Sequence, residues 1–323
     1  MFNRSDLDRA ASLIYRHIPP TPQYAWPLLA ARTGCEVWVK HENHTPTGSF
    51  KVRGGIVYMD RLLRRSQPPA GIVSATRGNH GQSLAFAGRA MGVSVTIVVP
   101  HGNSTEKNAA MRALGAELIE HGSDFEDARQ ESIRLAERRG LHLVPSFHPD
   151  LVLGVATYSL ELFQAARQID TLYVPIGLGS GICGAIQVRD LLGLPTQIVG
   201  VVAENADAYA QSFEGGEIVA TESANTIADG ISCRVPAPDA FAIIRRGVAR
   251  IVRVAEGEIK DAMRALHEDT HNTAEGAGAA ALAGLMQERE RQRGRKVAVV
   301  LSGGNVDRTL YADVLGENLS PAL

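Results

Sequence analysis

Short apolar runs separated by helical patterns dominate the middle of the chain and limit its possible folds. Strands are expected at 71–75, 95–100, 116–120 and 141–145, with helices at 81–92, 104–115 and 125–140 between them. Strands that are apolar along their whole length are buried on both faces, and helices between them indicate parallel pairing. The pattern therefore predicts an α/β, doubly wound fold.

Further apolar runs at 171–176, 197–204 and 296–302 predict a second sheet. No long Pro/Ser-rich linker separates the two sets of strands, so the two domains are expected to share a boundary. We expect a smaller α/β domain, residues 40–145, inserted into a large twisted-sheet domain made of residues 1–39 and 146–323.

Composition excludes several classes of function. The formal net charge of −2 gives no basic footprint for nucleic acid. No run approaches the roughly 20 apolar residues of a membrane span, and the N-terminus lacks the apolar core of a secretory signal. The cysteines, Cys35, Cys183 and Cys233, form no CxxC pair. This usage predicts neither a disulfide framework nor a zinc site, and fits a reducing cytoplasm.

A lysine stands out in the segment TPTGSFKVRGG. Only five of the 33 basic residues are lysines, and one of them, Lys51, follows a run of small and hydroxylic residues. Apolar residues recur after it at helical spacing, so Lys51 is expected at a helix N-terminus, where the helix dipole disfavours an ammonium. An amine in that position can form a Schiff base. The alternative is an ordinary exposed lysine on a loop.

Three further segments end predicted strands, where α/β proteins gather their ligands. SATRGNHGQS (74–83) has small residues and Asn79 in a strand-to-helix loop, although it can equally be a tight turn that caps the helix. VVLSGGNVD (299–307) places Ser302 at a strand tip beside two glycines, and by itself it can be just a turn.

The third of these segments, VPIGLGSGICGAI (174–186), is rich in glycine and can bind a phosphate through backbone N–H groups. It also supports a rival interpretation, because Gly179, Gly181 and Gly184 spell G-x-G-x-x-G and Glu204 ends the next strand. That pattern is typical of dinucleotide sites and predicts an NAD-dependent oxidoreductase. A lysine nucleophile, a phosphate loop and small polar strand tips together favour an aldehyde-bearing phosphate cofactor.

These motifs resemble the fold-type II pyridoxal-phosphate (PLP) enzymes, the tryptophan synthase β-like group. The segments are S-F-K-x-R-G, G-N-H-G-Q, the glycine loop, A-D-G at 228–230 and S-G-G-N-V-D, in the family's order from about Ile18 to Asp307. The chain is most similar to threonine/serine dehydratases and serine racemases. The resemblance implies PLP as the cofactor, a small amino acid as the substrate and a homodimer.

The resemblance also implies roles for individual residues. Lys51 would hold PLP as a Schiff base and then transfer the Cα proton. The other residues expected to contact the cofactor are Phe50, Asn79, Gly177, Leu178, Gly179, Ser180, Gly181, Glu275 and Ser302. The residues expected around the substrate are Ser49, Thr76, Arg77, Gly78, His80 and Ser146. Ser146 and Phe147 belong to the stretch 146–157, which we expect to contribute to the side-chain pocket.

The expected reaction is α,β-elimination from a β-hydroxy-α-amino acid, which yields a 2-oxo acid and ammonia. Ser302 would face the pyridine nitrogen, and a hydroxyl there does not force a proton onto the ring. The cofactor is then a milder electron sink, and rapid loss of the β-hydroxyl is favoured. Threonine or serine is the default substrate, and a role in amino-acid catabolism is expected because the chain ends soon after the S-G-G-N strand.

Two departures from the family keep alternatives open. Arg77 stands where racemases carry serine, which argues against racemisation and allows an acidic substrate such as 3-hydroxyaspartate, or a bulkier one such as 3-phenylserine. An arginine that is turned to solvent or salt-bridged is the other interpretation.

The positions aligned with the relatives' divalent-cation ligands are Val202 and Ala208, which cannot coordinate a cation through their side chains. Glu204 and Asp207 are nearby but shifted, so no metal is expected. A binding module without catalysis is disfavoured by the lysine, asparagine and serine.

Overall fold

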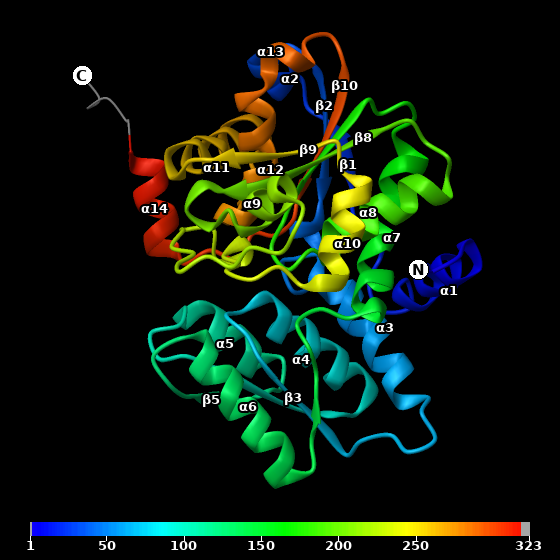
Figure 1. The fold of residues 1–323 in the computed structure, drawn as a ribbon, viewed down its shortest axis with the longest axis vertical. Helices are drawn as coiled ribbons and strands as arrows, with labels where there is room; N and C mark the ends of the chain where they lie inside the picture. Colours follow the sequence, from blue (N-terminus) through cyan, green and yellow to red (C-terminus); the bar gives the residue numbers. More distant parts are fainter. Residues whose placement is uncertain (1, 318–323) are drawn as a thin grey trace. The chain divides into compact units, whose positions relative to one another are not determined.

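The structure is a computed structural model that describes residues 2–317 (Figure 1). The chain forms two compact units. Unit 1 contains residues up to 20 together with 45–157, and unit 2 contains 21–44 together with the residues from 158 onward. Unit 1 thus groups the first helix and 146–157 with residues 45–145 of the predicted small domain of 40–145, whereas 40–44 fall in unit 2. The predicted functional domains stay a prediction.

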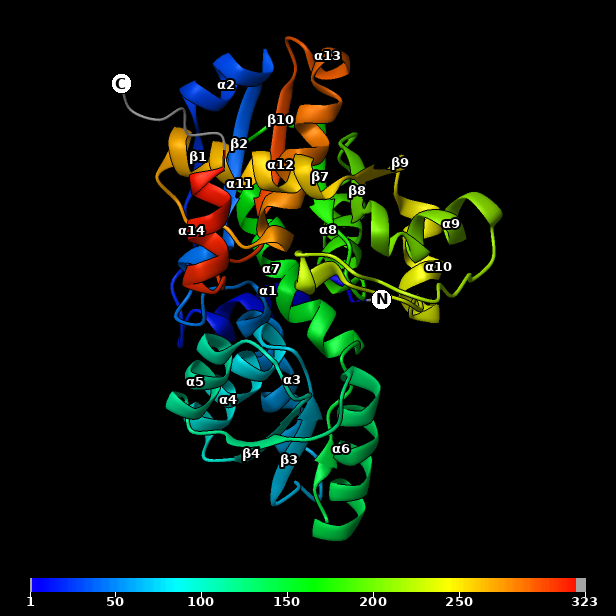
Figure 2. The same ribbon diagram turned by 90° about the vertical axis from the view of Figure 1, so that its left-hand side faces the viewer.

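Unit 2 is built on a six-stranded sheet in the order β1-β2-β10-β7-β8-β9, which Figure 2 shows from left to right. All neighbours pair in parallel except β1 and β2. Its strands are β1 (Gln23–Ala25), β2 (Glu36–His41), β7 (Thr171–Pro175), β8 (Gln197–Ala203), β9 (Arg250–Val254) and β10 (Lys296–Leu301). The predicted strands at 171–176, 197–204 and 296–302 are confirmed within one residue at their ends, whereas β1, β2 and β9 were not predicted.

The helices of unit 2 pack on this sheet in two groups. Helix α12 lies along β10, β7 and β8 with α11 packed against it, while α8 packs on β7 and β8 and contacts α10. The helices are α2 (Pro27–Thr33), α8 (Ser180–Leu191), α9 (Ala208–Gly215), α10 (Pro238–Gly247), α11 (Glu256–Thr270), α12 (Gly276–Gln287), α13 (Arg289–Gln292) and α14 (Arg308–Gly316). Short 3-10 helices are η1 (Glu42–His44), η2 (Glu204–Ala206) and η3 (Asp229–Ile231).

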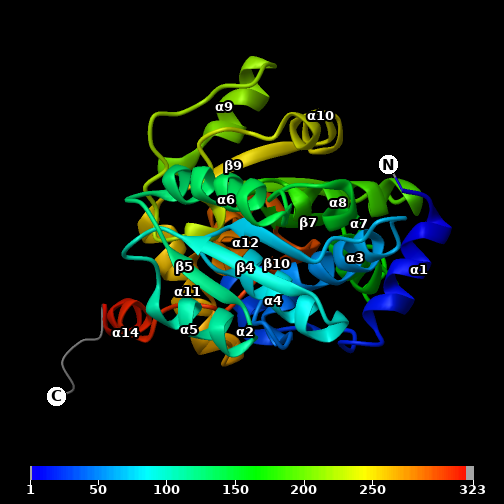
Figure 3. The same cartoon turned by 90° about the horizontal axis from the view of Figure 1, so that it is seen from below.

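Unit 1 is built on a four-stranded parallel sheet in the order β5-β4-β3-β6. Figure 3 shows α6 on one face of this sheet and α4 and α5 on the other. Its elements are α1 (Arg4–Ile14), α3 (Lys51–Leu63), β3 (Gly71–Ala75), α4 (Asn79–Met91), β4 (Ser94–Val99), α5 (Thr105–Ala113), β5 (Glu117–Glu120), α6 (Phe125–Arg139) and β6 (His142–Leu143). Helix α7 (Pro149–Ala165) continues from unit 1 into unit 2. The predicted strands and helices of this unit are confirmed, although β6 covers only two of the five residues expected at 141–145.

The central strands of both sheets are apolar on both faces, as the sequence pattern requires. Every residue of β3 is buried, and in β10 only Lys296 is partly exposed. The three cysteines are free thiols, all buried. Among residues 2–317 no helix has both the length and the apolar character needed to cross a membrane.

Candidate active site

Lys51 is the first residue of α3, as its spacing from the following apolar residues predicted. The preceding loop is fixed by Thr45, whose hydroxyl accepts a 3.0 Å hydrogen bond from the Ser49 N–H and donates a 2.9 Å one to the Ser49 carbonyl. The Lys51 side chain is half-buried, and its Nζ lies 4.6 Å from the centroid of the Phe50 ring. This arrangement holds the amine at the positive end of a helix, beside an aromatic ring.

The start of α3 is tied to α4. Ser83 Oγ donates a 2.6 Å hydrogen bond to the Lys51 carbonyl. The two helices approach so closely at this point that a Cβ on Gly55 would lie 2.3 Å from Ser83 Oγ. A side chain at residue 55 would therefore push the helices apart and shift the lysine, which explains the second glycine of the pair that follows it.

The loop between β3 and α4, together with the first turn of α4, carries five of the predicted site residues. Thr76, Gly78, Asn79 and His80 are buried, whereas Arg77 is exposed. The Thr76 hydroxyl accepts a 3.0 Å hydrogen bond from the Gly78 N–H, which closes the turn, and Asn79 is the first residue of α4. Within the described chain no ion pair or hydrogen bond of the Arg77 side chain is found, so this guanidinium is turned to solvent.

Two buried polar atoms in these loops lack hydrogen-bond partners in the described part of the chain. They are Ser49 Oγ and His80 Nε2. Burial, and secondarily the charge of Lys51, lowers the pKa of His80 to about 3, so its imidazole is neutral at physiological pH. Buried polar groups without a partner are costly, and their presence here is what a carboxylate ligand would resolve.

The glycine-rich loop of unit 2 joins β7 to α8. Gly179 has φ +99, a left-handed conformation that favours glycine, and Ser180 begins α8. The first N–H groups of a helix have no intrahelical acceptor, and together with the helix dipole they form an anion site. Gly177, Leu178 and Ser180 are partly exposed, whereas Gly179 and Gly181 are buried.

Three other segments of unit 2 come together around this loop. A Cβ on Gly177 would lie 2.4 Å from the carbonyl oxygen of Gly230, and a Cβ on Gly230 would lie 2.9 Å from Ala277 Cβ. Ser302 follows β10, the strand that pairs with β7 in the sheet. Its Oγ donates a 3.3 Å hydrogen bond to the Ala277 carbonyl. The glycine loop, the A-D-G segment, the start of α12 and the tip of β10 therefore form one cradle.

Glu275 immediately precedes α12 and is buried. Its N–H donates a 3.1 Å hydrogen bond to the carbonyl of Gly303, the residue after Ser302. Because β7 and β10 are parallel neighbours, their carboxyl ends lie at the same edge of the sheet. The cradle thus brings the predicted phosphate loop, Ser302 and Glu275 together within unit 2, and a backbone nest beside a neutral hydroxyl fits a phosphate-bearing aromatic cofactor.

The remaining predicted residue, Ser146, lies in the loop between β6 and α7 and is partly exposed. Sequence reasoning missed two residues of these surroundings. Lys107 is buried, and its side chain fills the space beside Gly78, where a Cβ would lie 2.5 Å from Lys107 Cδ. Ala277, the acceptor of the Ser302 hydroxyl, gave no signal, because its role rests on a backbone carbonyl.

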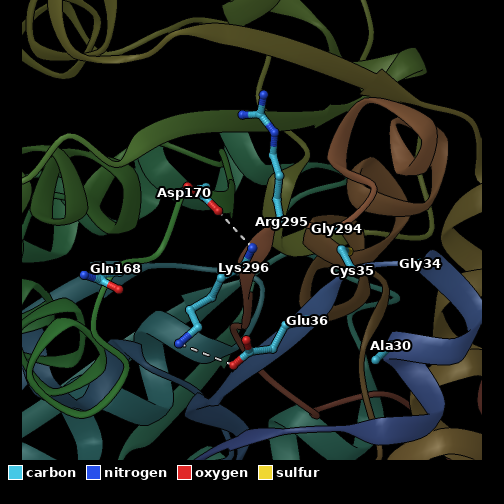
Figure 4. Close-up of a pocket in the computed structure, with 9 residues that line it drawn as sticks. All are labelled: Ala30, Gly34, Cys35, Glu36, Gln168, Asp170, Gly294, Arg295 and Lys296. Atoms are coloured by element: carbon cyan, nitrogen blue, oxygen red, sulfur yellow. Dashed lines mark hydrogen bonds and ion pairs between the residues drawn. The ribbon is translucent and has the colours of Figure 1, made fainter.

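A separate hollow lies at the opposite edge of the unit 2 sheet, where β2, β7 and β10 begin (Figure 4). Its volume is about 750 Å³, and its lining includes Glu36, Asp170 and Lys296. None of the predicted site residues line it.

The possible metal site near the end of β8 can also be assessed. Asp207, one of the two acidic residues noted there in the sequence, accepts a 2.8 Å hydrogen bond from Arg253 Nε. The described residues contain no group of three or more His, Cys, Asp or Glu side chains that could hold a metal ion.

Comparison with known proteins identifies the class of enzyme. The family model described as "Pyridoxal-phosphate dependent enzyme" matches residues 14–303. An L-threo-3-hydroxyaspartate ammonia-lyase of Pseudomonas sp is 34% identical over 311 residues, which cover 96% of this chain and 97% of the relative. An L-threonine ammonia-lyase of Thermotoga maritima is 33% identical over 90% of this chain and 73% of its own.

The solved structures agree. Maize serine racemase has a TM-score of 0.90 and 28% identity, with 96% of each chain covered. The chain therefore belongs to the family of pyridoxal-phosphate dependent enzymes, and the predicted fold class and cofactor are confirmed. Its relatives make it a PLP-dependent lyase, and the family match favours the phosphate cradle over the dinucleotide interpretation of the glycine loop.

Proposed function

We propose that the protein is an ammonia-lyase that converts a β-hydroxy-α-amino acid of the threonine or serine type into a 2-oxo acid and ammonia. The observation that carries the proposal is the neutral Ser302 hydroxyl, held by the Ala277 carbonyl beside the glycine loop. The names of the relatives from Pseudomonas sp and Thermotoga maritima support it. When bound, PLP draws electrons from the Cα bonds of the amino acid and so makes the Cα proton removable.

Each residue then has a defined task. Lys51 Nζ would hold PLP covalently and would then move the Cα proton, with Phe50 beside it. The phosphate would be bound by the N–H groups of Gly177, Leu178, Gly179, Ser180 and Gly181. Asn79 would donate to the phenolic oxygen, Ser302 would face the pyridine nitrogen and Glu275 would lie by the ring. A hydroxyl would leave the pyridine nitrogen unprotonated, which favours loss of the β-hydroxyl.

The substrate carboxylate has its own set of partners in the proposal. Ser49 and His80 offer buried polar atoms that have no partner among residues 2–317, and Thr76 and Gly78 form the turn that leads to His80. A neutral His80 donates through Nε2 without adding a second charge beside Lys51. Ser146 contributes to the side-chain pocket. A homodimer and a cytoplasmic location remain predictions from the family resemblance.

The decisive experiment is a near-visible absorption spectrum of the purified protein, recorded while β-hydroxy amino acids are added in turn. We expect a yellow band of lysine-bound PLP that changes with one amino acid, together with release of 2-oxo acid. Lys51→Ala should abolish both. Lys260→Ala, on α11, should retain both and serves as the control. A wild-type protein that stays colourless after incubation with PLP would refute the proposal.

Arg77 supports a second candidate substrate. Its exposed guanidinium has no side-chain partner in the described chain and lies between the buried Thr76 and Gly78. A second carboxylate on the substrate would pair with it, which makes L-threo-3-hydroxyaspartate the acidic alternative, in line with the Pseudomonas relative's name. Arg77→Ser should then reduce kcat/KM for hydroxyaspartate by about 10- to 100-fold and change that for serine less than threefold. Equal losses for both substrates would exclude this role, and accumulation of the opposite enantiomer would instead indicate a racemase.

A further inference from the structure

Tyr58 contacts two histidines that flank one loop of unit 1. It lies on α3, seven residues after Lys51, and its side chain is buried. Its hydroxyl is 2.8 Å from His142 Nε2, and its ring meets the ring of His148 edge to face, with centroids 5.0 Å apart at 88°. One side chain on the lysine-bearing helix thus contacts the last strand before the loop and the last residue of the loop.

The loop in question comprises residues 144–148, between β6 and α7, and includes Ser146. Its first residue is anchored to β3, because the Val144 N–H donates to the Val73 carbonyl at 2.9 Å and Ser74 Oγ donates to the Val144 carbonyl at 3.0 Å. β3 and β6 are parallel neighbours, so the loop leaves the sheet at the same edge as residues 76–80. That edge carries the proposed substrate-binding turn.

The far end of the loop is fixed by His148. Its Nδ1 accepts a 3.1 Å hydrogen bond from the Asp150 N–H and so caps the first turn of α7. A nitrogen that accepts this bond carries no proton, so the capping form of His148 is the neutral ring protonated at Nε2. Protonation of Nδ1 would remove the acceptor and direct a new donor toward Asp150 Oδ2, which is 3.6 Å away.

Charged groups surround this cluster from α3 and α7. Arg61 pairs with Asp150, and Arg65 follows the end of α3. Burial, followed by the charges of Arg65 and His148, lowers the pKa of His142. Burial raises the pKa of Tyr58 to about 12, with Arg65 opposing and Asp150 adding to the shift. At neutral pH this hydrogen bond therefore joins a neutral phenol and a neutral imidazole.

We propose that Tyr58 is a positioning residue, which holds the loop 144–148 through His142 and His148 and thereby determines which substrate side chains are accepted. The proposal rests on the proposed function, because the loop acts on specificity only if Ser146 faces the substrate. It adds a residue that works through the loop rather than by touching substrate or cofactor. Its effect should fall on KM, since Lys51 and the phosphate cradle are left unchanged.

The first test compares Tyr58→Phe with His142→Phe and the double variant in the PLP-loaded enzyme. Loss of one hydrogen bond should raise KM for the preferred amino acid by about 2- to 10-fold, with kcat changed less than twofold. The double variant should match either single one, because both remove the same bond. Tyr15→Phe, at a tyrosine that is 40% exposed, is the control and should leave KM unchanged. Additive effects, or an unchanged KM for threonine, serine and hydroxyaspartate, would overturn the proposal.

A second readout does not depend on turnover. Proton NMR titration of the histidine ring signals should show His142 titrating at higher pH in Tyr58→Phe than in the wild type, because the opened site admits water. Amide exchange at Asp150 should quicken in Tyr58→Ala, which also removes the ring contact with His148. Unchanged titration and exchange would refute the positioning role even if the enzyme proved inactive. A wild-type protein without a PLP band would refute the proposed function alone.

Discussion

The ammonium of Lys40 lies 2.6 Å from Glu161 Oε2, and both side chains are shielded from solvent. Glu42 is equally buried, 4.0 Å from the same ammonium, and Lys40 also donates to the Thr21 carbonyl at 2.7 Å. Lys40 lies in the buried second half of β2, the strand that leads to η1 at the edge where Ser302 lies. A buried charge that loses its partner is strongly destabilising, whereas a well-paired one is tolerated.

We therefore expect Lys40→Met to lower the free energy of unfolding by about 3–5 kcal/mol, because Glu161 and Glu42 would be left without this cation. Lys296→Met is the matched control. Its partner is Glu36, at the other end of β2, 3.4 Å away, and the two side chains are 28% and 49% exposed (Figure 4). That variant should cost less than about 1 kcal/mol. Urea unfolding measures both, and similar losses would show that the buried network has no special role.

The cradle makes a prediction about cofactor affinity. A methyl group on Gly177 would meet the Gly230 carbonyl oxygen at 2.4 Å and displace the loop that we propose binds the phosphate. Gly177→Ala should raise the Kd for PLP at least about 10-fold, as expected when about 1.4 kcal/mol or more of binding is lost. Gly215→Ala, at a glycine with no heavy atom within 4 Å of the added Cβ, should bind PLP as the wild type does. Absorbance titration of the apoenzyme gives both constants.

Stability should fall in mild acid because of two buried histidines. Burial lowers the pKa of His80 to about 3 and that of His41 to about 4, with charges on Lys51 and His44 as the second causes. Between pH 6.5 and 4 the unfolded chain binds protons that the folded chain excludes. The free energy of unfolding should therefore decrease as pH falls through this range, by about 1.4 kcal/mol per pH unit for each histidine, and be unaffected by them above it.

Urea unfolding at pH 7.5, 6.0 and 5.0 measures this slope. His80→Asn should reduce it, whereas His101→Asn, at an exposed histidine, should not. The same slope in all three proteins would mean that His80 takes up its proton as readily in the folded chain as in the unfolded one.

Removal of divalent cations should not reduce activity. Arg253 Nε lies 2.8 Å from Asp207 Oδ2, and its other two nitrogens bind Glu214 at 2.6 and 2.9 Å. The arginine thus already supplies the positive charge near the end of β8. We expect turnover after treatment with EDTA and desalting to stay within about 20% of the untreated enzyme, with no gain on addition of Mg²⁺. A loss restored by Mg²⁺ would show that a cation site exists outside this ion pair.

The sequence predicted the elements whose pattern depends only on local burial. β3, β4, β7, β8 and β10 read as continuous apolar runs because both of their faces are covered. β2 and β9 escaped prediction because they carry charges: Lys40 is neutralised inside the protein, and Arg250 and Arg253 on β9 pair with Glu288 and Asp207. In a sequence, charged residues are taken as a sign of exposure. Strands whose charges are paired with distant residues are therefore not recognised as strands.

The features of the candidate site also differ in whether they could be predicted from the sequence. The position of Lys51 at a helix start and of Ser302 at a strand tip could be read from neighbouring residues. The partnerless atoms of Ser49 and His80 could not, because they depend on which groups fail to approach them. Tyr58 gave no signal either, since its hydrogen-bond partner His142 is 84 residues away and neither belongs to a recognised motif.

The place of β10 in its sheet has a consequence for how the protein is made. β10 is the last strand among the described residues, yet it lies between β2 and β7 and pairs residues 296–301 with 36–41. The sheet of unit 1 draws all its strands from residues 71–143, so it can close while the ribosome is still producing the rest. β2 can pair only with the short strand β1 until residues 296–301 have emerged, and such late, long-range pairing is slow and exposes apolar edges. During synthesis Lys51 thus takes its place in a folded unit well before the sheet that carries the proposed phosphate cradle is complete.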